Sequence, residues 1–393
     1  MGSALDAWTN DLMGSRNDKQ TPSSCNQGPS PTKFLQHLAG QVQLLACLKW
    51  LGEFQITAII PLEGSISALD VAALCGVPDR DLYRVVRMAA TAGFLHEPQP
   101  GRIAHTALSS AFVTRFSLQD ASMFLAENAA PTALHMATAQ PHHDHPGSES
   151  AYAVASNTST PFHSAIADEE RLQRQYSAYR KCSEDAEDSV TQVLLRLNWH
   201  SMGSACVVDA CAQSTDLADA LAENFPSLRF ILQTPTDGDC LNGPAACSER
   251  ITTQRKTPNG QQLVKDALVY IIRIPTLGPA PYPQLRSELK AHLPILRGNP
   301  SATLIVAPPL LPEPGSVDPS VESLARLRDL SNLQFTSECK MELSELITVI
   351  NSVRDDSGRL VAANMLRFRS GATSAVSVKY EYEYDMNNFY NMA

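Results

Sequence analysis

The sequence predicts an α/β protein with a doubly wound sheet in its C-terminal half. Residues 206–236 read as strand, helix and strand, which is one βαβ unit of a parallel sheet. Apolar runs at residues 267–274 and 302–307 follow, and two β-rich runs, residues 360–368 and 375–382, close the chain. Helical patterns lie between them, at residues 282–296, 321–330 and 341–353. This alternation predicts a parallel sheet with an antiparallel C-terminal edge.

The turn of the βαβ unit lacks the residues that a nucleotide or adenosyl cofactor needs. Such turns are rich in glycine, which lets the backbone approach the ligand, and the second strand ends in an acid that holds the ribose. Here the first strand ends at Asp209, and the turn after it contains no glycine. Its residues include Cys211, Ala212, Gln213 and Thr215, and Thr234 stands where the acid is expected. We predict a cofactor scaffold whose binding site is lost.

Composition narrows the possible functions. A net charge of −10 over 393 residues opposes non-specific binding to nucleic acid, because phosphate neutralisation needs surplus Lys and Arg. The 9 cysteines are scattered without CxxC spacing, which favours reduced thiols in the cytosol or nucleus. No apolar run approaches the length of about 18 residues that a membrane helix needs, so we expect no membrane segment.

The N-terminal region is predicted to begin with a tail and a long amphipathic helix. Residues 1–31 are polar without an apolar period and are expected to be disordered. Residues 33–51 are expected to form a helix with one buried face. That face carries Leu38, Val42, Leu45 and Leu48. It exceeds what one small domain covers, so we expect a homodimer.

Residues 32–118 are predicted to form a winged-helix domain. Helical patterns at residues 66–76 and 77–92 precede a hairpin with its turn at residues 98–101. A basic stripe on the second helix is formed by Arg80, Arg84 and Arg87. Such a stripe fits a DNA groove, but the neighbouring Asp79 and Asp81 keep the local charge near balance. A solvated or dimer-facing helix is therefore the favoured interpretation.

Residues 119–200 are predicted to be a helical linker and dimerisation region. A loop interrupts it, with the sequence Pro141-His142-His143-Asp144-His145-Pro146. Histidine and aspartate are metal-ligating types. Adjacent residues on a flexible loop rarely converge on one ion, so we predict no metal site.

Together these features resemble the fungal and plant small-molecule O-methyltransferases that use S-adenosylmethionine, over about residues 34 to 385. The motifs that carry this resemblance are residues 83–88 (YRVVRM), residues 92–94 (AGF), and Trp199 followed by Val207-Val208-Asp209. The resemblance implies a class I methyltransferase-like sheet for residues 201–393. It places the family's glycines near Cys211, Ala212, Gln213 and Thr215, and its ribose-binding acid at Thr234.

The same resemblance implies a catalytic His just after the strand at residues 270–274. This chain has Pro275-Thr276-Leu277-Gly278-Pro279 there, and none of these side chains can take a proton from an acceptor hydroxyl. The cofactor loop, the ribose acid and the base are all absent. We therefore expect no bound cofactor, no catalytic residue and no methyl transfer.

Within that family, the chain is most similar to the methyltransferase-like co-activators of fungal polyketide gene clusters, of the aflatoxin-pathway type. The carrying segments are residues 44–55 (LLACLKWLGEFQ), 93–98 (GFLHEP) and 209–215 (DACAQST). The resemblance implies a nuclear co-activator, with the cytoplasm as a second location, that works with a zinc-cluster transcription factor of the same cluster. The acidic balance favours a DNA-binding partner over DNA, with weak DNA contact through the basic stripe once a partner tethers the chain.

Two alternatives stay open at this point. An enzyme of another type, such as a pericyclase, needs only a shaped pocket and a few hydrogen-bond donors. Lys340, Arg273 and His135 are candidate donors, although surface or structural roles are favoured for each. The other alternative is a surviving O-methyltransferase with an unusual cofactor loop.

Overall fold

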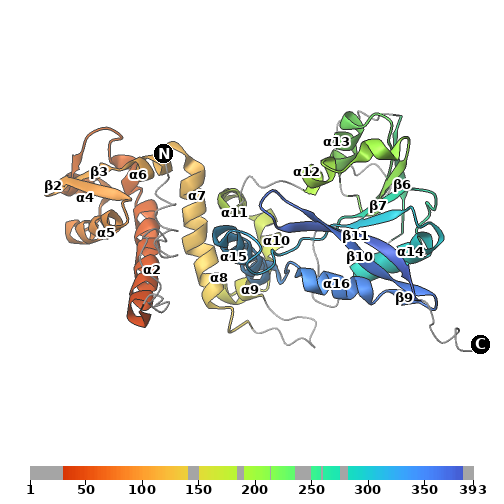
Figure 1. The fold of residues 1–393 in the computed structure, drawn as a ribbon. Helices are drawn as coiled ribbons and strands as arrows, with labels where there is room; N and C mark the ends of the chain where they lie inside the picture. The colour runs from red at the N-terminus through yellow and green to blue at the C-terminus, as the bar shows by residue number, and fades with distance from the viewer. Residues whose placement is uncertain are drawn as a thin grey trace, which may run out of the picture. The chain divides into compact units, whose positions relative to one another are not determined.

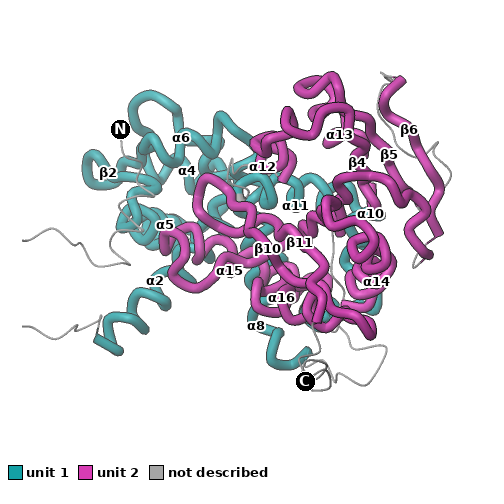
Figure 2. Tube along the Cα trace, turned by 45° about the vertical axis from the view of Figure 1, so that its right-hand side comes forward, with its two compact units in different colours: residues 1–185 teal, residues 186–393 magenta. Residues whose placement is uncertain are grey.

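The computed structural model describes residues 30–139, 150–183, 190–212, 214–234, 249–257, 260–274 and 282–383. The chain divides into two compact units, Met1–Asp185 and Ala186–Ala393, coloured separately in Figure 2. The predicted tail up to residue 29, the loop with three His, and Gln213 lie outside the described residues. The domain boundaries given above stay predictions. No helix within the described ranges is both long and apolar enough to cross a membrane.

The first unit begins with the long helix α2 (Pro31–Glu53). The Ser30 hydroxyl accepts a hydrogen bond from the Lys33 N–H at 3.3 Å, and Pro31 suits the first helical position. The prediction of one buried face is wrong for the N-terminal half, because Leu38 is 48% and Val42 is 60% exposed. Only the C-terminal half packs against the core of the unit, through residues such as Leu51. An apolar strip of α2 is therefore exposed in the described part of the first unit.

A small sheet and its helices follow α2 in the predicted order. The elements are α3 (Ile56–Ile59), β1 (Ile66–Ser67), α4 (Ala68–Cys75), α5 (Asp79–Thr91), β2 (Leu95–Gln99), β3 (Arg102–His105) and α6 (Ala107–Thr114). The strands are antiparallel in the order β1-β3-β2. Gly76 and Gly93 end the two helices at φ values of 66° and 69°, which glycine adopts without strain. The helices and hairpin confirm the predicted pattern, and the winged-helix role stays a prediction.

The remaining described part of the first unit is helical. Its elements are α7 (Phe116–Phe124), η1 (Leu125–Ala129), α8 (Ala130–Leu134), α9 (Ala151–Ala155), α10 (Phe162–Asp168) and α11 (Glu170–Ser183). Two ion pairs hold α11 to α7 and η1, because Arg174 lies 2.9 Å from Asp120 and Arg171 lies 3.0 Å from Glu127. Phe124 packs between these helices against the rings of Phe162, Tyr176 and Tyr179.

The second unit is built on an eight-stranded sheet (Figure 1). The strands are β4 (Cys206–Asp209), β5 (Arg229–Thr234), β6 (Ile251–Arg255), β7 (Val269–Ile272), β8 (Thr303–Val306), β9 (Arg354–Asp355), β10 (Gly358–Arg367) and β11 (Thr373–Tyr382). Their order is β6-β5-β4-β7-β8-β11-β10-β9, with parallel pairing from β6 to β8 and antiparallel pairing from β8 to β9. This confirms the doubly wound sheet with an antiparallel edge. Strands β6 and β9 escaped the sequence analysis.

Helices cover both faces of this sheet. They are α12 (Val190–Leu195), η2 (Trp199–Met202), α13 (Asp216–Asn224), α14 (Pro283–Gly298) and α16 (Leu343–Asn351). The helix α15 (Pro319–Thr336) belongs to the same unit but adds no side chain to either core. Val208 and Tyr270 point into the core formed with α14 and α16, whereas Val207 and Ile271 point into the core formed with α12 and α13. Side chains alternate along buried parallel strands, so near-continuous apolar runs such as 269–272 serve two cores at once.

Candidate functional site

The sheet of the second unit has a switch point between β4 and β7. The chain passes from β4 outward to β5 and β6, and later places β7 and β8 on the other side of β4. In α/β sheets, ligands bind in the crevice at the carboxyl ends of strands where the order reverses in this way. Asp209 ends β4 and Arg273 follows β7, so both lie at this point.

A buried ion pair joins these two residues. The Arg273 Nε donates a hydrogen bond to the Asp209 Oδ2 at 3.2 Å, and the Nη2 group donates to the same oxygen. The Asp209 side chain is 4% exposed and that of Arg273 is 22% exposed. Burial raises the pKa of Asp209, and the positive charge of Arg273 opposes that rise. Arg273, a candidate donor to a substrate, is therefore engaged with the chain's own carboxylate.

Two backbone N–H groups of the turn after β4 form hydrogen bonds with neighbouring strands. The Ala210 N–H donates to the Ile271 carbonyl at 2.8 Å, and the Ala212 N–H donates to the Gln233 carbonyl at 3.0 Å. Ala210 and Ala212 are each 4% exposed. An anion or ribose site needs such N–H groups to point at the ligand. Here the N–H groups of Ala210 and Ala212 are already bonded to carbonyls of β7 and β5.

The described end of β5 likewise carries no acidic side chain for a ribose. Thr234 is 5% exposed, and its carbonyl accepts the Lys256 N–H at 2.9 Å. The pairing extends the parallel register of β5 and β6 by one residue beyond Arg255. The predicted ribose position is thus part of the buried sheet edge.

A second buried polar cluster lies beside the switch point, on the α14 face. Lys256 and Glu288 form an ion pair whose side chains are 4% and 6% exposed. The Gln262 amide donates to the Gln233 side chain at 2.8 Å and contacts the His292 Nε2 at 3.0 Å. Sequence reasoning missed this cluster. Its one local signal is the spacing of Glu288 and His292, four residues apart on the apolar face of α14.

Burial in the same region sets the protonation of two groups. Desolvation lowers the pKa of His292 to about 4, so its imidazole is neutral and can accept from Gln262. Desolvation raises the pKa of the Cys211 thiol to about 12, with the nearby Glu288 carboxylate adding to the rise. A thiol in this state is a poor nucleophile, because the thiolate is the reactive form.

These residues do not fit S-adenosylmethionine, the cofactor that the fold implies. Its ribose needs an acid after the second strand, and its close approach needs a glycine turn with free N–H groups. This chain has Thr234 where the acid is needed, and it has the buried Ala210 and Ala212 in the turn where glycine is needed. Among the described residues, Asp209 and Arg273 lie at the switch point and pair with each other.

The basic stripe of α5 divides into two parts in the first unit. Arg87 is 3.1 Å from Glu97 of β2, and its guanidinium lies 5.5 Å from the centroid of the Tyr83 ring. Glu97 also accepts the Gly101 N–H at 2.6 Å, so Arg87 helps fix the hairpin. Its acidic partner is Glu97 and not the neighbouring Asp79 or Asp81. Arg80 and Arg84 are exposed on the same helix.

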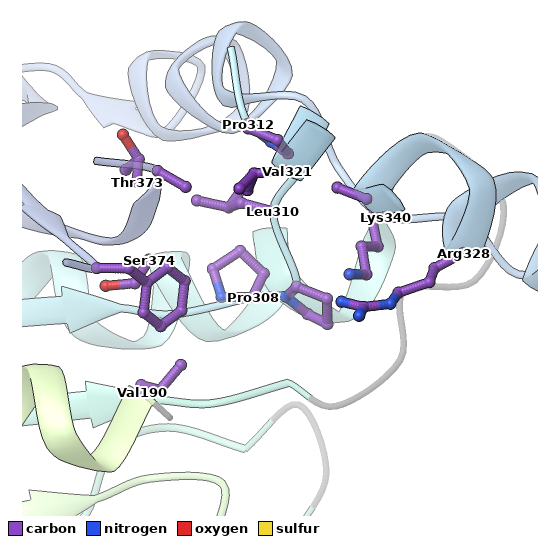
Figure 3. Close-up of a pocket in the computed structure, with 13 residues that line it drawn as sticks. Val190, Pro308, Leu310, Pro312, Val321, Arg328, Lys340, Thr373 and Ser374 are labelled. Atoms are coloured by element: carbon purple, nitrogen blue, oxygen red, sulfur yellow. The ribbon is translucent and has the colours of Figure 1, made fainter. Parts of the chain in front are cut away.

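The other predicted residues lie apart from the switch point. The His135 Nδ1 lies 2.8 Å from the Pro131 carbonyl, at the end of α8 in the first unit. Lys340, in the segment between α15 and α16, lines a pocket of the second unit (Figure 3). Residues 275–280, where a catalytic His was looked for, lie outside the described residues, as do His142, His143, Asp144 and His145. No group of three metal-ligating side chains occurs among the residues that are described.

Comparison with solved structures defines the class of fold. OxaC in complex with SAH and oxaline has a TM-score of 0.55 at 17% identity, over 96% of this chain and 97% of that chain. Mitomycin 7-O-methyltransferase MmcR has a TM-score of 0.53 at 16% identity, over 89% of this chain and 98% of that chain. LepI in complex with SAH and a substrate analogue has a TM-score of 0.53 at 13% identity, over 97% and 92%. The protein has the class I O-methyltransferase-like fold.

Comparison with curated proteins defines the family. A transcriptional coactivator of Pseudocercospora fijiensis is 54% identical over 355 residues, covering 86% of this chain and 96% of that protein. The cladofulvin cluster transcriptional coactivator claA of Passalora fulva is 44% identical over 88% of this chain and 86% of its own length. The dothistromin biosynthesis regulatory protein aflJ of Dothistroma septosporum is 41% identical over 89% and 84%. No protein-family model matches the chain. The chain belongs to the transcriptional coactivators of fungal secondary-metabolite gene clusters.

Proposed function

We propose that this coactivator acts with a zinc-cluster transcription factor of its own gene cluster, in the nucleus, and that its methyltransferase-like unit is a scaffold without methyl-transfer activity. The observation that carries the second part is the buried pair of Asp209 and Arg273 at the switch point. An adenosyl cofactor would have to displace a guanidinium from a carboxylate that is 4% exposed. Leaving that carboxylate unpaired costs several kcal/mol, on the order of 3–5.

The interaction surface for the transcription factor is assigned to the first unit. Arg80 and Arg84 present two exposed charges on α5, in a chain whose net charge is −10. Two exposed guanidinium groups favour an acidic segment of a partner, and they favour weak phosphate contact once the partner is on DNA. Arg87 is not part of this surface, since Glu97 holds it.

The coactivator is proposed to act as a homodimer. The uncovered strip of α2 includes Phe34, Leu35, Leu38 and Val42, which are 56%, 63%, 48% and 60% exposed. Exposed apolar side chains gathered on one helix mark an association surface, and a second copy would cover them symmetrically. Light scattering on the full chain tests this. Val42→Glu should shift the mass from dimer to monomer, and a monomeric wild type contradicts the proposal.

Co-purification tests the partnership. The full chain, tagged and expressed in the native fungus, should bring down the zinc-cluster factor of the same cluster. The double variant Arg80→Ala/Arg84→Ala should reduce promoter occupancy of the complex, while the matched variant Arg286→Ala on α14 should not. If the double variant captures the factor and occupies the promoter as well as wild type does, α5 is not the interaction surface. Failure to capture the factor with wild type removes the partnership.

Calorimetry tests the absence of methyl-transfer chemistry. The full chain is titrated with S-adenosylmethionine, with OxaC, whose solved structure contains SAH, as the positive control. We expect no heat of binding for the coactivator at concentrations that saturate OxaC. Micromolar binding would contradict the scaffold proposal and leave the coactivator family unaffected.

A further inference from the structure

A groove of about 330 Å³ lies between α2 and α5, which pack side by side in the first unit (Figure 1). Its floor includes half-buried residues of α2 and of the C-terminal end of α5, namely Gly40, Leu44, Met88 and Ala92. Exposed polar residues such as Thr91 form its rim. An apolar floor inside a polar rim is typical of protein–protein interfaces.

The lack of a side chain at Gly40 keeps this groove open. A Cβ atom at Gly40 would meet no heavy atom of another part of the chain within 4 Å, so no close neighbour excludes a larger residue. Gly40 lies inside α2, and its φ is not one of the positive values that favour glycine. Glycine inside a helix lowers stability relative to alanine. Room for an incoming side chain is a reason for glycine here that the fold itself does not supply.

The groove and the apolar strip of α2 lie on opposite faces of the helix. An α-helix turns by about 100° per residue, which puts Gly40 and Leu44 about 160° from Leu38 and Val42 around the axis. Leu38 and Val42 belong to the strip proposed above as the dimer surface, and both are exposed. A dimer formed through the strip therefore leaves the groove open to a different partner.

Positive charge continues the line of the groove along α5. Arg80, Arg84 and Met88 follow one another at intervals of four residues, so they share one face of the helix. Both arginines are exposed, and at about 1.5 Å per residue Arg84 and Arg80 stand about 6 and 12 Å from Met88 along the axis. Asp79 and Asp81 stand about 100° to either side of Arg80, off this face. The groove therefore has an apolar part and, beside it, a cationic part.

We propose that this groove binds an acidic amphipathic helix of the transcription factor, with apolar side chains against Leu44 and Met88 and with carboxylates beside the two exposed arginines. The inference rests on the partnership proposed above, and it adds the surface and the kind of segment that is bound. Helices commonly dock in grooves through apolar residues spaced three or four apart. The flexible thioether of Met88 adapts to such residues, and charge complementarity selects an acidic segment.

Binding between the purified full-length coactivator and the full-length zinc-cluster factor of its gene cluster tests the site, by biolayer interferometry at two salt concentrations. Wild type should bind the factor, and more weakly at the higher salt, because salt screens exposed charges. Gly40→Leu should weaken binding at least about tenfold, since its side chain fills the groove and leaves both arginines in place. Arg80→Ala/Arg84→Ala should weaken binding about tenfold at low salt and remove most of the salt dependence.

Gly298→Leu at the end of α14 is the matched control. A Cβ atom there also meets nothing within 4 Å, so the variant adds the same side chain at an open position of the second unit. It should leave the affinity for the factor unchanged. Thermal unfolding should show that each variant is folded. Light scattering should give Gly40→Leu the same mass as wild type, because the groove is not on the proposed dimer face.

A photo-reactive p-benzoylphenylalanine in place of Thr91 identifies what lies at the rim of the groove, since light joins it to whatever it contacts. A crosslink to an acidic segment of the factor is the expected result. A crosslink to a second copy or to the chain's own residues 1–29 overturns the groove and leaves the partnership standing. Equal affinities of Gly40→Leu and Gly298→Leu, or a changed mass for Gly40→Leu, have the same consequence. A wild type that binds no factor overturns the partnership itself, and this inference with it.

Discussion

Two paired basic side chains of the second unit contrast with two exposed arginines on α5 of the first unit. In the second unit, Arg273 and Lys256 are paired with Asp209 and Glu288, and three of these four side chains are 6% exposed or less. On α5 of the first unit, Arg80 and Arg84 are exposed. Buried pairs are costly to break and are closed to ligands, whereas exposed charges contribute little to stability and are open to partners. The comparison supports a stabilising role for the pairs at the sheet and fits the recognition surface that we propose on the first unit.

The largest expected effect comes from breaking the buried pair on the α14 face. Lys256→Met should lower the free energy of unfolding of the second unit by about 3–5 kcal/mol, because Glu288 is left buried without a counter-charge. Urea unfolding of the full chain measures it. The double variant Lys256→Met/Glu288→Leu should regain most of the loss. A double variant as unstable as the single one would show that packing, and not charge, is the cause.

The next effect is a pH dependence from His292. In the unfolded chain this imidazole protonates near its ordinary pKa of 6.5, whereas burial beside Lys256 lowers the pKa to about 4 in the folded protein. The contribution to stability is therefore complete above pH 6.5 and is lost as pH falls toward 4, by up to about 3 kcal/mol.

Comparison with His292→Gln isolates this contribution. Urea unfolding at several pH values should give a shallower loss of stability for the variant between pH 6.5 and 4, since it has no group that titrates there. Parallel pH profiles for the two proteins contradict the assigned burial of the imidazole.

A smaller effect is expected at the hairpin of the first unit. Arg87→Ala removes the partner of Glu97, which in turn accepts the Gly101 N–H. Both side chains are at the surface, so global stability should change little. Faster amide hydrogen exchange at Gly101 is the expected signal. Exchange as slow as in the wild type would show that Glu97 holds the turn unaided.

The smallest effect on stability is expected at the exposed part of α5. Arg80→Ala/Arg84→Ala should leave thermal unfolding unchanged, because both side chains are exposed and alanine favours the helix. A clear fall in Tm would show that these arginines serve the fold, and the contrast between the two units would then fail.

Local pattern was enough to predict most of the fold. Apolar runs such as 269–272 and 303–306 are buried on both sides, so their sequence is distinctive. Strand β6 escaped because its sequence, ITTQR, lies at the sheet edge with most side chains partly exposed. The N-terminal half of α2 was predicted as buried, since a helical period alone does not show whether a partner surface exists within the chain.

The site could be predicted in part. The sequence alone shows that the turn after Asp209 has no glycine and that β5 does not end in an acid, because both features concern neighbouring residues in the chain. The pair of Lys256 and Glu288 joins positions 32 residues apart, and that of Asp209 and Arg273 joins positions 64 apart. Likewise, no nearby residue in the sequence shows that Arg87 forms an ion pair while Arg80 and Arg84 are exposed. Only the fold determines which of the three meets Glu97.

The two buried ion pairs of the second unit have an evolutionary consequence. Removing one member of a buried ion pair leaves the charge of the other member buried and unpaired. A single substitution in either pair therefore gives a less stable chain. Two compensating changes would have to occur together in each pair. Each pair is therefore expected to persist once it has formed, because the intermediate with one unpaired buried charge is less stable.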